Sequence, residues 1–247
     1  MSKSIIIFGF HAIQAQLDSN PECLLKVLTL DNRNDKRLNT LITQLDRLGI
    51  NTQQANKQQL DKLTKNQTHQ GIAAEILLPT LPNLDGLIHY VEKLNNSSLI
   101  LILDSIQDPR NLGACLRSAN AAGVDCVVIN KDGSAPINAL VHKTSAGALN
   151  QLKIFSVTNL SRTIKALKEH NIWVVGLDGA TDQSIYQIDL TTPTAIIMGA
   201  EGSGLRSLTK KSCDQLAMIP MQGNVESLNV SVATGIALFE ASRQRNL

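Results

Sequence analysis

Polar and apolar residues alternate in the segment that leads toward the C-terminus, which reads ESLNVSVATGIALFEASRQ from residue 226. The polar positions are Ser227, Asn229 and Ser231. Apolar residues then recur at the spacing that predicts one face of a helix, namely Val232, Ile236 and Phe239. A helix needs a single N-cap side chain, which serine and asparagine both supply. Any one of these residues could be a cap or bind the backbone, but all three together indicate a further role.

A second polar segment, LDSIQDPRNLGACLRSANAAGV, covers residues 103–124. A strand is expected to end at Asp104, Pro109 breaks the chain, and Asn111 is placed to cap the helix that follows. Glycine and alanine keep this helix narrow, so another backbone can approach it closely. Arg117, six residues after Asn111, is a candidate phosphate ligand. A surface ion pair is the alternative for this arginine.

The third segment, AIIMGAEGSGLRSL at 195–208, places Gly199, Gly202 and Gly204 after an apolar strand. Such a loop is typical of a place where backbone meets a ligand, although a plain strand-to-helix turn is the alternative. The glycine order matches neither a P-loop nor a dinucleotide-binding fingerprint. The acidic side chain of Glu201 suits hydroxyl groups or a cation better than phosphate.

These segments offer asparagine, arginine, glutamate and serine but no histidine, and the sequence suggests no Ser-His-Asp or Cys-His arrangement. Such side chains bind and position other groups. They suit a reaction whose reactive group arrives on a cofactor.

The elements that must hold these segments form a strongly α/β pattern from residue 99 onward. Apolar strands are predicted at 99–103, 124–129, 173–176, 195–198 and 216–219, with helical patterns between them. Apolar strands without alternation indicate a parallel sheet that is covered on both faces. Ligands of such sheets bind beyond the carboxyl ends of the strands, which is where the three segments lie.

Residues 1–78 have the pattern of a smaller α/β unit. Helices are predicted near 9–17 and 36–48, strands at 24–30, 51–55 and 71–77, and an exposed helix and loop within 53–70. Residues 79–98 contain prolines, a glycine and an Asn/Ser cluster, which indicates a linker with room for a short helix at 87–94. The predicted organisation is therefore 1–78, a linker at 79–98, and 99–247.

Composition sets outer limits on the protein class. The chain of 247 residues is 43% hydrophobic and 18% charged, which is typical of a globular protein with a full core. No apolar run approaches the roughly 18 residues of a membrane span, and the N-terminus makes no convincing signal peptide, so we expect a cytoplasmic protein. Four cysteines without a CxxC pair argue against a metal site and disulfides. The net charge of +2 identifies no partner.

Taken together, NLGACLRSANAAG, IIMGAEGSGL and IPMQGNVESLNVSVATGIALFEASRQ resemble the three motifs of the SpoU family of RNA ribose 2′-O-methyltransferases, within the SPOUT superfamily. The resemblance covers 98–247 and, more loosely, FGFHAIQAQL near the N-terminus. It implies a trefoil knot in the C-terminal domain, S-adenosylmethionine as cofactor, and a homodimer with a shared active site. The N-terminal part is similar to RNA-binding ribosomal proteins of the L30e/L7Ae kind.

The resemblance also implies roles for individual residues. The positions that match the family's functional residues are Asn111, Arg117, Glu201, Ser227 and Asn229. Cofactor contacts are expected, largely through the main chain, from Gly199, Gly202, Ile219, Met221 and Leu228. Because a guanidinium is a poor proton acceptor, we expect Arg117 to bind a phosphate beside the target nucleotide rather than to act as a general base. Ser227 and Asn229 would project to the reacting centre, while Ser231 or a neighbour caps the helix.

The substrate implied by the resemblance is a guanosine in the peptidyl-transferase P-loop of 23S ribosomal RNA. Two alternatives remain open: a transfer RNA ribose 2′-O-methyltransferase, and a non-catalytic RNA-binding or ribosome-assembly factor that keeps the fold. A nicotinamide dehydrogenase is disfavoured because the glycine order is wrong. Candidate RNA contacts in the N-terminal part are Lys3, Arg33, Lys36 and Arg37.

Overall fold

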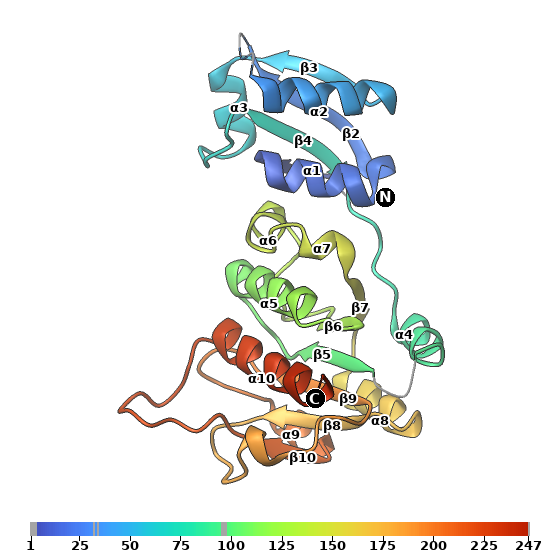
Figure 1. Ribbon diagram of the computed structural model, residues 1–247, viewed down its shortest axis with the longest axis vertical. Coiled ribbons are helices and arrows are strands. Elements are labelled where there is room, and N and C mark those ends of the chain that lie inside the picture. Colours follow the sequence, from blue (N-terminus) through green and yellow to red (C-terminus); the bar gives the residue numbers. More distant parts are fainter. Residues whose placement is uncertain (1–3, 32, 34, 95–97, 247) are drawn as a thin grey trace. The chain divides into compact units, whose positions relative to one another are not determined.

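The computed structural model describes residues 4–31, 33, 35–94 and 98–246, and these fall into two compact units (Figure 1). The first unit comprises Met1–Thr80 together with Ile137–Gln151, and the second comprises Leu81–Pro136 and Leu152–Leu247. The chain therefore leaves the second unit after residue 136 and returns to it at residue 152. Lys3 and residues 95–97 of the predicted linker lie outside the described residues.

The first unit is built on a four-stranded sheet. Its strand order is β1 (Ser4–Phe8), β4 (Ile72–Leu77), β2 (Leu24–Leu30) and β3 (Thr52–Ala55). The pairings β1–β4 and β4–β2 are antiparallel, and β2–β3 is parallel. The helices of this unit are α1 (Phe10–Ser19), α2 (Lys36–Arg47), α3 (Lys57–Leu63), α6 (Ala139–Thr144) and α7 (Ala148–Gln151).

Helices cover both faces of this small sheet. On one face Ile13 of α1 and Leu41 of α2 belong to the same buried cluster as Ile72 of β4. On the other face Leu60 of α3 is buried against Phe8, and Ala139 of α6 packs on that cluster. The small α/β unit expected from the sequence is confirmed, and a segment from the middle of the chain contributes to its core.

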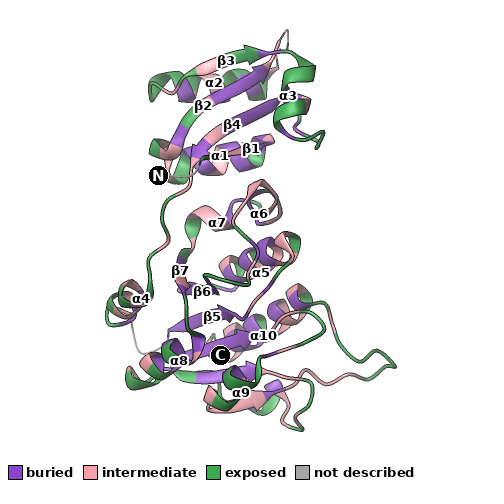
Figure 2. Ribbon diagram, turned by 180° about the vertical axis from the view of Figure 1, so that it is seen from behind, coloured by how far each residue is buried: buried purple, intermediate pink, exposed green. Residues whose placement is uncertain are grey.

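The second unit is built on a six-stranded sheet. The strand order is β10 (Gln215–Ala217), β8 (Trp173–Leu177), β9 (Thr194–Met198), β5 (Leu99–Leu103), β6 (Cys126–Asn130) and β7 (Lys153–Val157). Every neighbouring pair is parallel. The central strands are buried along their whole length (Figure 2). The predicted parallel sheet with two covered faces is confirmed. The trefoil knot stays a prediction from the resemblance.

Two layers of helices sandwich this sheet. Residues of α4 (Leu84–Val91) and α8 (Leu160–Glu169) share one buried cluster with Ile100 and Ile102 of β5. Helix α5 (Pro109–Ala121) and the C-terminal helix α10 (Val230–Arg245) contact each other, and α10 also contacts β9. The remaining helical elements of this unit are η2 (Ile185–Gln187) and α9 (Ser207–Ser212), whereas η1 (Pro21–Cys23) belongs to the first unit. Among the described helices, none combines the length and apolarity that crossing a membrane requires.

Several details differ from the sequence-based expectations, and the first is strand β1, which was not predicted. Strand β7 was not predicted, because the segment KIFSV mixes Lys153 and Ser156 with its apolar residues. Strand β10 ends at Ala217 rather than at residue 219. Helix α4 covers Leu84–Val91 rather than residues 87–94, and its Leu87 and Val91 are buried in the core of the second unit.

The C-terminal helix turns the predicted apolar face outward. Val232 and Phe239 remain 51% and 52% exposed. The residues that α10 buries lie on another face, and they include Thr234, Ala237 and Leu238. The hydrophobic spacing seen in the sequence therefore does not mark the side of the helix that packs on this chain's own sheet.

Candidate active site

The glycine-rich loop after β9 is a tight turn. A Cβ at Gly199 would lie 2.2 Å from the carbonyl carbon of Gly204, so only glycine fits where the loop returns on itself. Ala200 and Gly204 exchange backbone hydrogen bonds of 3.1 and 2.9 Å. Gly202 and Gly204 have φ of +75° and +64°, a region that favours glycine. The loop shape thus follows from the sequence, and it sets the position of Glu201 at its tip.

A buried carboxylate ties the far end of this loop to the central strand. Asp104, which follows β5, is 1% exposed and accepts a hydrogen bond of 2.7 Å from the hydroxyl of Thr209 in α9. Nη2 of Arg206 lies 2.7 Å from the other carboxylate oxygen of Asp104. The ion pair and the hydrogen bond give this buried charge the partners that burial demands. They fix where the loop 199–206 ends.

Asn229 has two functions at the start of α10. Its side-chain oxygen accepts hydrogen bonds from the backbone N–H and the hydroxyl of Ser231, at 2.9 and 2.6 Å, and so caps the helix. Its side-chain nitrogen donates to Oε1 of Glu201 at 3.1 Å and to Oδ1 of Asn111 at 3.2 Å. The expected division of roles is therefore wrong in one respect, because Ser231 donates to the cap and Asn229 both caps and reaches the other polar residues.

Asn111 completes a network of three side chains. Its side-chain nitrogen also donates to Oε1 of Glu201, so a carboxylate, two amides and three distant segments meet at one point. The prediction that Asn111 caps its helix is wrong. Asp108 caps α5, accepting from the backbone N–H of Arg110 at 2.8 Å, and Pro109 occupies the first turn. Because Asn111 does not cap the helix, its side-chain amide is available to bind Glu201 and Asn229, and these three residues form the Asn111–Glu201–Asn229 network.

Arg117 and Ser227 lie outside this network. Arg117 is exposed on α5, and the described part of the chain offers it no acidic partner, which argues against the ion-pair alternative. Ser227 is exposed and lines the cavity described next, with no side-chain hydrogen bond to the described residues. Both side chains are accessible to a ligand that binds from solvent.

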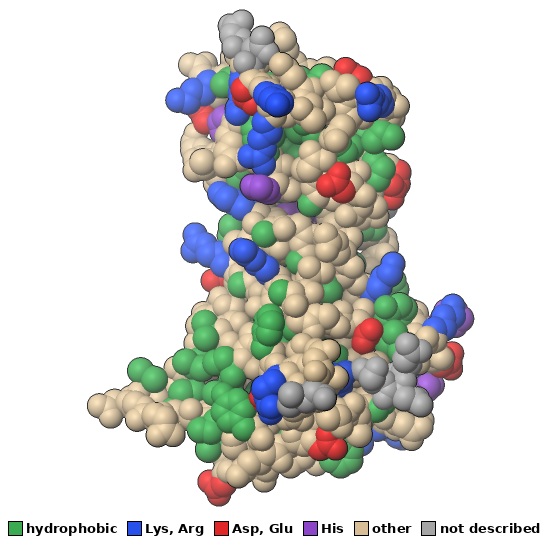
Figure 3. Space-filling model, viewed as in Figure 1, with side chains coloured by type: hydrophobic (Ala, Val, Ile, Leu, Met, Phe, Trp, Pro, Cys, Tyr) green, Lys and Arg blue, Asp and Glu red, His purple; other side chains and the backbone are tan. Residues whose placement is uncertain are grey.

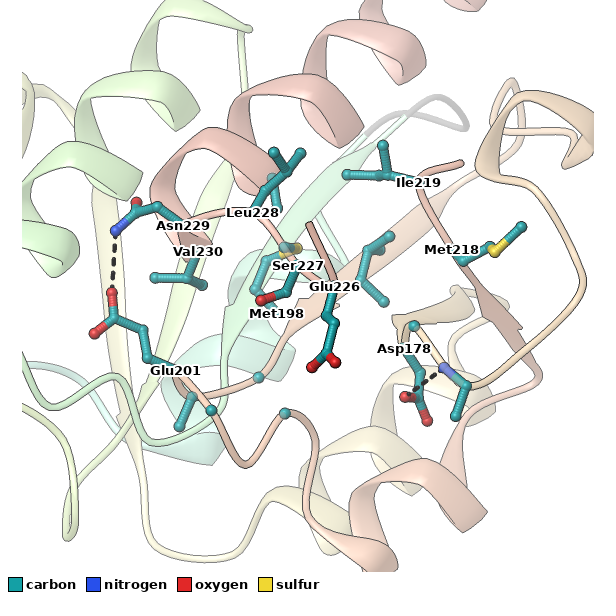
Figure 4. Close-up of a pocket in the computed structure, with 18 of the residues that line it drawn as sticks. Asp178, Met198, Glu201, Met218, Ile219, Glu226, Ser227, Leu228, Asn229 and Val230 are labelled. Atoms are coloured by element: carbon teal, nitrogen blue, oxygen red, sulfur yellow. Dashed lines mark hydrogen bonds between the residues drawn. The ribbon is translucent and has the colours of Figure 1, made fainter. Parts of the chain in front are cut away.

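A cavity of about 800 Å³ lies where β8, β9 and β10 end, and the segment before α10 closes it (Figure 4). All five residues that were expected to contact the cofactor line it: Gly199, Gly202, Ile219, Met221 and Leu228. Glu201, Ser227 and Asn229 line it as well, whereas Asn111 and Arg117 do not. The cavity thus lies at the carboxyl ends of parallel strands, where sheets of this kind bind ligands.

The sequence reasoning missed one wall of this cavity, which consists of residues 177–180 at the end of β8. Asp178 in this wall forms an ion pair of 2.6 Å with Nζ of Lys210. A signal was available, because the strand at 173–176 was predicted and the LDGA that follows is another polar, glycine-containing strand end.

The charges that line the cavity have one sign. Its charged residues are Asp178, Glu201 and Glu226, and the described lining contains no lysine, arginine or histidine. Such a surface favours a cationic ligand and disfavours one that carries phosphate groups. The described residues contain no group of three or more His, Cys, Asp or Glu that could hold a metal ion.

The thiol nearest the network is not a nucleophile. Cys115 of α5 is fully buried, and its Sγ lies 3.4 Å from the hydroxyl of Thr234 in α10. Burial raises the pKa of this thiol to about 11, so it stays protonated at neutral pH. Cys115 packs α5 on α10, and the side chains that remain for chemistry are the polar ones already named.

Sequence and structure comparisons agree with this geometry. Residues 98–239 match the SpoU rRNA Methylase family, and residues 6–81 match a family described as RNA 2′-O ribose methyltransferase substrate binding. The first match covers more than half of the chain, so the chain belongs to the SpoU rRNA methylase family. The resemblance of its three motifs to that family is thereby confirmed.

Curated relatives match along almost the entire chain. The chain is 48% identical over 243 residues to the Escherichia coli K12 protein named 23S rRNA (guanosine-2′-O-)-methyltransferase RlmB, a match that covers 98% of this chain and 100% of that protein. It is 46% identical over 244 residues to the Yersinia pestis protein of the same name, covering 99% of each.

Solved structures share the fold. A crystal structure described as an RNA 2′-O ribose methyltransferase has a TM-score of 0.81 at 26% identity, covering 100% of this chain and 90% of that one. The SpoU methyltransferase AviRb from Streptomyces viridochromogenes, in complex with AdoMet, has a TM-score of 0.82 at 23% identity, covering 98% and 91%.

Proposed function

We propose that this protein transfers a methyl group from S-adenosylmethionine to the ribose 2′-hydroxyl of a guanosine in 23S ribosomal RNA. The observation that carries the proposal is the Asn111–Glu201–Asn229 network beside a cavity whose charged residues are all acidic. Relatives that are 46–48% identical over the whole chain carry this activity in their names.

The cavity fits the cofactor. S-adenosylmethionine has two positively charged groups, a sulfonium and an ammonium, one negatively charged carboxylate and no phosphate. This net positive charge suits a lining that contains Asp178, Glu201 and Glu226 and, among the described residues, no basic side chain. When bound, it supplies a methyl group that is already activated for transfer. We propose that the backbone at Gly199, Gly202, Ile219, Met221 and Leu228 holds its adenosyl part.

The chain's own task is then to position the acceptor hydroxyl. Positioning alone is worth on the order of 7–11 kcal/mol in favourable cases. We propose that the amides of Asn111 and Asn229 and the carboxylate of Glu201 orient the ribose, with Ser227 at the cavity wall. The exposed guanidinium of Arg117 binds the neighbouring phosphate, for which its paired N–H donors are well shaped.

Ribosomal RNA is favoured over transfer RNA by the extent of the matches. A neighbour described as a TrmH/SpoU tRNA modifying enzyme, from A. aeolicus, aligns with 66% of this chain at a TM-score of 0.57. The relatives named for 23S rRNA align with 98–99% of the chain, which includes the N-terminal unit. In this proposal residues 1–78 hold the RNA, residues 79–98 link them to the rest of the chain, and residues 99–247 carry the methyl-transfer site. The reaction takes place in the cytoplasm, where ribosomal RNA is made.

Candidate RNA contacts in the N-terminal unit lie at the start of α2. The guanidinium groups of Arg33 and Arg37 lie over the ring of Phe10, at 4.8 and 4.7 Å from its centroid. Arg33 is also paired with Asp35. Lys36 and Arg37 are exposed, and we propose that these two bind RNA phosphates, with Phe10 holding the Arg37 side chain in place.

A homodimer is supported by the outward face of α10. Val232, Ile236 and Phe239 share that face, and two of them are about half exposed. In Figure 3 hydrophobic side chains gather on the side of the second unit that carries α10. Exposed apolar patches of this kind mark interaction sites. We propose that a second copy of the chain covers this face.

The function is tested by incubating the purified protein with S-adenosylmethionine and unmodified 23S ribosomal RNA. Digestion to nucleosides and mass spectrometry should detect 2′-O-methylguanosine. Arg117→Ala should abolish the product while sparing cofactor binding measured by calorimetry. The matched control is Arg110→Ala, which removes an exposed arginine from the same helix.

Two outcomes would count against the proposal. Full turnover by Arg117→Ala would remove Arg117 from the mechanism. Cofactor binding without any product from 23S ribosomal RNA would shift the substrate to transfer RNA, or the role to RNA binding without catalysis.

A further inference from the structure

Glu226 is the carboxylate of the cavity for which the described part of the chain provides no partner. Asp178 is paired with Lys210, and Glu201 accepts from the two network amides. Glu226 lines the same cavity and makes no hydrogen bond or ion pair with any residue that the structure describes. Among the described residues, its carboxylate is therefore the one in the lining that neither an ion pair nor a hydrogen bond stabilises.

The side chain of Glu226 extends into the cavity. Figure 4 shows its carboxylate between Glu201 on one side and Asp178 on the other, next to Ser227. A ligand that fills the cavity must therefore lie close to this charge. At a partly solvated site, a charge a few ångströms away still changes binding by several-fold.

The proposed reaction changes the charge of the ligand in this cavity. The bond between sulfur and the methyl carbon breaks, a bond between that carbon and the ribose 2′-oxygen forms, and the hydroxyl proton leaves to solvent. The donor begins as a sulfonium cation and ends as a neutral thioether, while its ammonium and carboxylate are unchanged. Only the positive charge on sulfur distinguishes the donor from its product electrostatically.

We propose that Glu226 selects the charged methyl donor over the neutral product S-adenosylhomocysteine. This inference rests on the proposed function. The Glu226 carboxylate attracts the sulfonium form and gains nothing from the thioether, so it favours loading of the donor and release of the product. The other two carboxylates contribute less to this selection, because Lys210 and the network amides already bind them.

The test is calorimetric titration of the full chain with three ligands. These are S-adenosylmethionine, S-adenosylhomocysteine, and sinefungin, which carries an amine in place of the methylated sulfur and is cationic there. Glu226→Gln should weaken the binding of S-adenosylmethionine and sinefungin by about 5- to 10-fold. The affinity for the thioether S-adenosylhomocysteine should change by less than about 2-fold. Glu226→Lys should reduce the preference for the cationic ligands over S-adenosylhomocysteine more than Glu226→Gln does.

Two controls accompany the titrations. Asp182→Asn removes a negative charge from an exposed residue that does not line the cavity, and it should leave all three affinities unchanged. The preference of the unaltered protein for the cation should decrease as salt rises, since salt screens an exposed carboxylate. The preference of Glu226→Gln for the cationic ligands should change much less as salt rises.

Equal weakening of all three ligands by Glu226→Gln would overturn the inference, because it would place Glu226 beside the ammonium that they share. Unchanged affinities would overturn it as well. Both outcomes leave the proposed function standing, since the unaltered protein still binds the donor. Failure of the unaltered protein to bind S-adenosylmethionine would instead remove the proposed function itself.

Discussion

The side-chain amide of Asn229 joins the start of the last helix to the glycine-rich loop, donating a hydrogen bond of 3.1 Å to the carboxylate of Glu201. The same side chain caps α10 through its oxygen. One residue thus supports both a structural element and the polar network, and its two functions use different atoms. They can be separated by changing one atom at a time.

Asn229→Asp keeps the capping oxygen but replaces the donor nitrogen with an oxygen. We expect the variant to stay folded, with a free energy of unfolding within about 1 kcal/mol of the original, because the cap survives. Methyl transfer should fall by at least about 100-fold, because a second carboxylate then faces Glu201 where an amide stood. Urea denaturation and single-turnover kinetics measure the two effects. Loss of stability with full activity would contradict this separation.

Asp104→Asn should loosen the loop after β9. The substitution leaves the Arg206 guanidinium without its carboxylate and weakens the hydrogen bond from Thr209, at a cost of about 1–3 kcal/mol. Cofactor affinity should fall with it, because the loop 199–206 forms part of the cavity wall. Denaturation and calorimetry on the same samples test the coupling. Lys168→Gln, which removes an ion pair of 2.7 Å with Asp214 elsewhere in the second unit, is the control.

Phe239→Glu should separate the proposed dimer without unfolding the chain. Phe239 is 52% exposed, so a carboxylate there stays solvated in the monomer but would be buried in an interface. We expect a monomer by light scattering and an unchanged circular dichroism spectrum. Leu208→Glu, at a residue that is 70% exposed on α9, is the matched control and should leave the oligomeric state unchanged. A dimer that survives Phe239→Glu would place the interface elsewhere.

The free energy of unfolding should depend on pH because of His142. Burial lowers the pKa of this imidazole from 6.5 to about 4, and its Nε2 has no hydrogen-bond partner among the residues that the structure describes. The unfolded chain therefore binds a proton at a higher pH than the folded chain does. The contribution of neutral His142 is complete above pH 6.5 and is lost as the pH falls toward about 4, with a slope of at most about 1.4 kcal/mol per pH unit. His142→Gln should flatten that slope in urea titrations at pH 7, 6 and 5.

The parallel sheet could be predicted because its strands carry an unmistakable pattern. The run LILIL at β5 is buried at all five positions, and its pattern alone indicated a strand with two covered faces. Strand β7 lacks such a run, because Lys153 is exposed and Ser156 is only half-buried. Hydrophobic pattern reports burial, so it identifies central strands better than those at the edge of a sheet.

The site could be predicted in its parts but not in its connections. The motifs gave Asn111, Glu201 and Asn229, yet their hydrogen bonds join residues 90, 118 and 28 positions apart in the chain. No local pattern encodes such contacts. The capping error at Asn111 was avoidable, since Asp108 followed by Pro109 is a common way to begin a helix.

The assignment of 137–151 to the first unit lay beyond sequence reading. This segment lies between β6 and β7 of the large sheet, and its Ala139 nevertheless packs on the core of the small one. Nothing in its sequence distinguishes a helix of one unit from a helix of the other, because both bury alanine and valine.

The wall of the cavity formed by residues 225–233 is synthesised after every strand of both sheets. A nascent chain that has already made every strand of both sheets still has an open groove in place of a cavity. A chain that stopped between residues 218 and 224 would retain every strand but lack the wall that encloses a ligand. In this fold the strands thus come first in the chain, and the segment that turns their open edge into a binding site follows them.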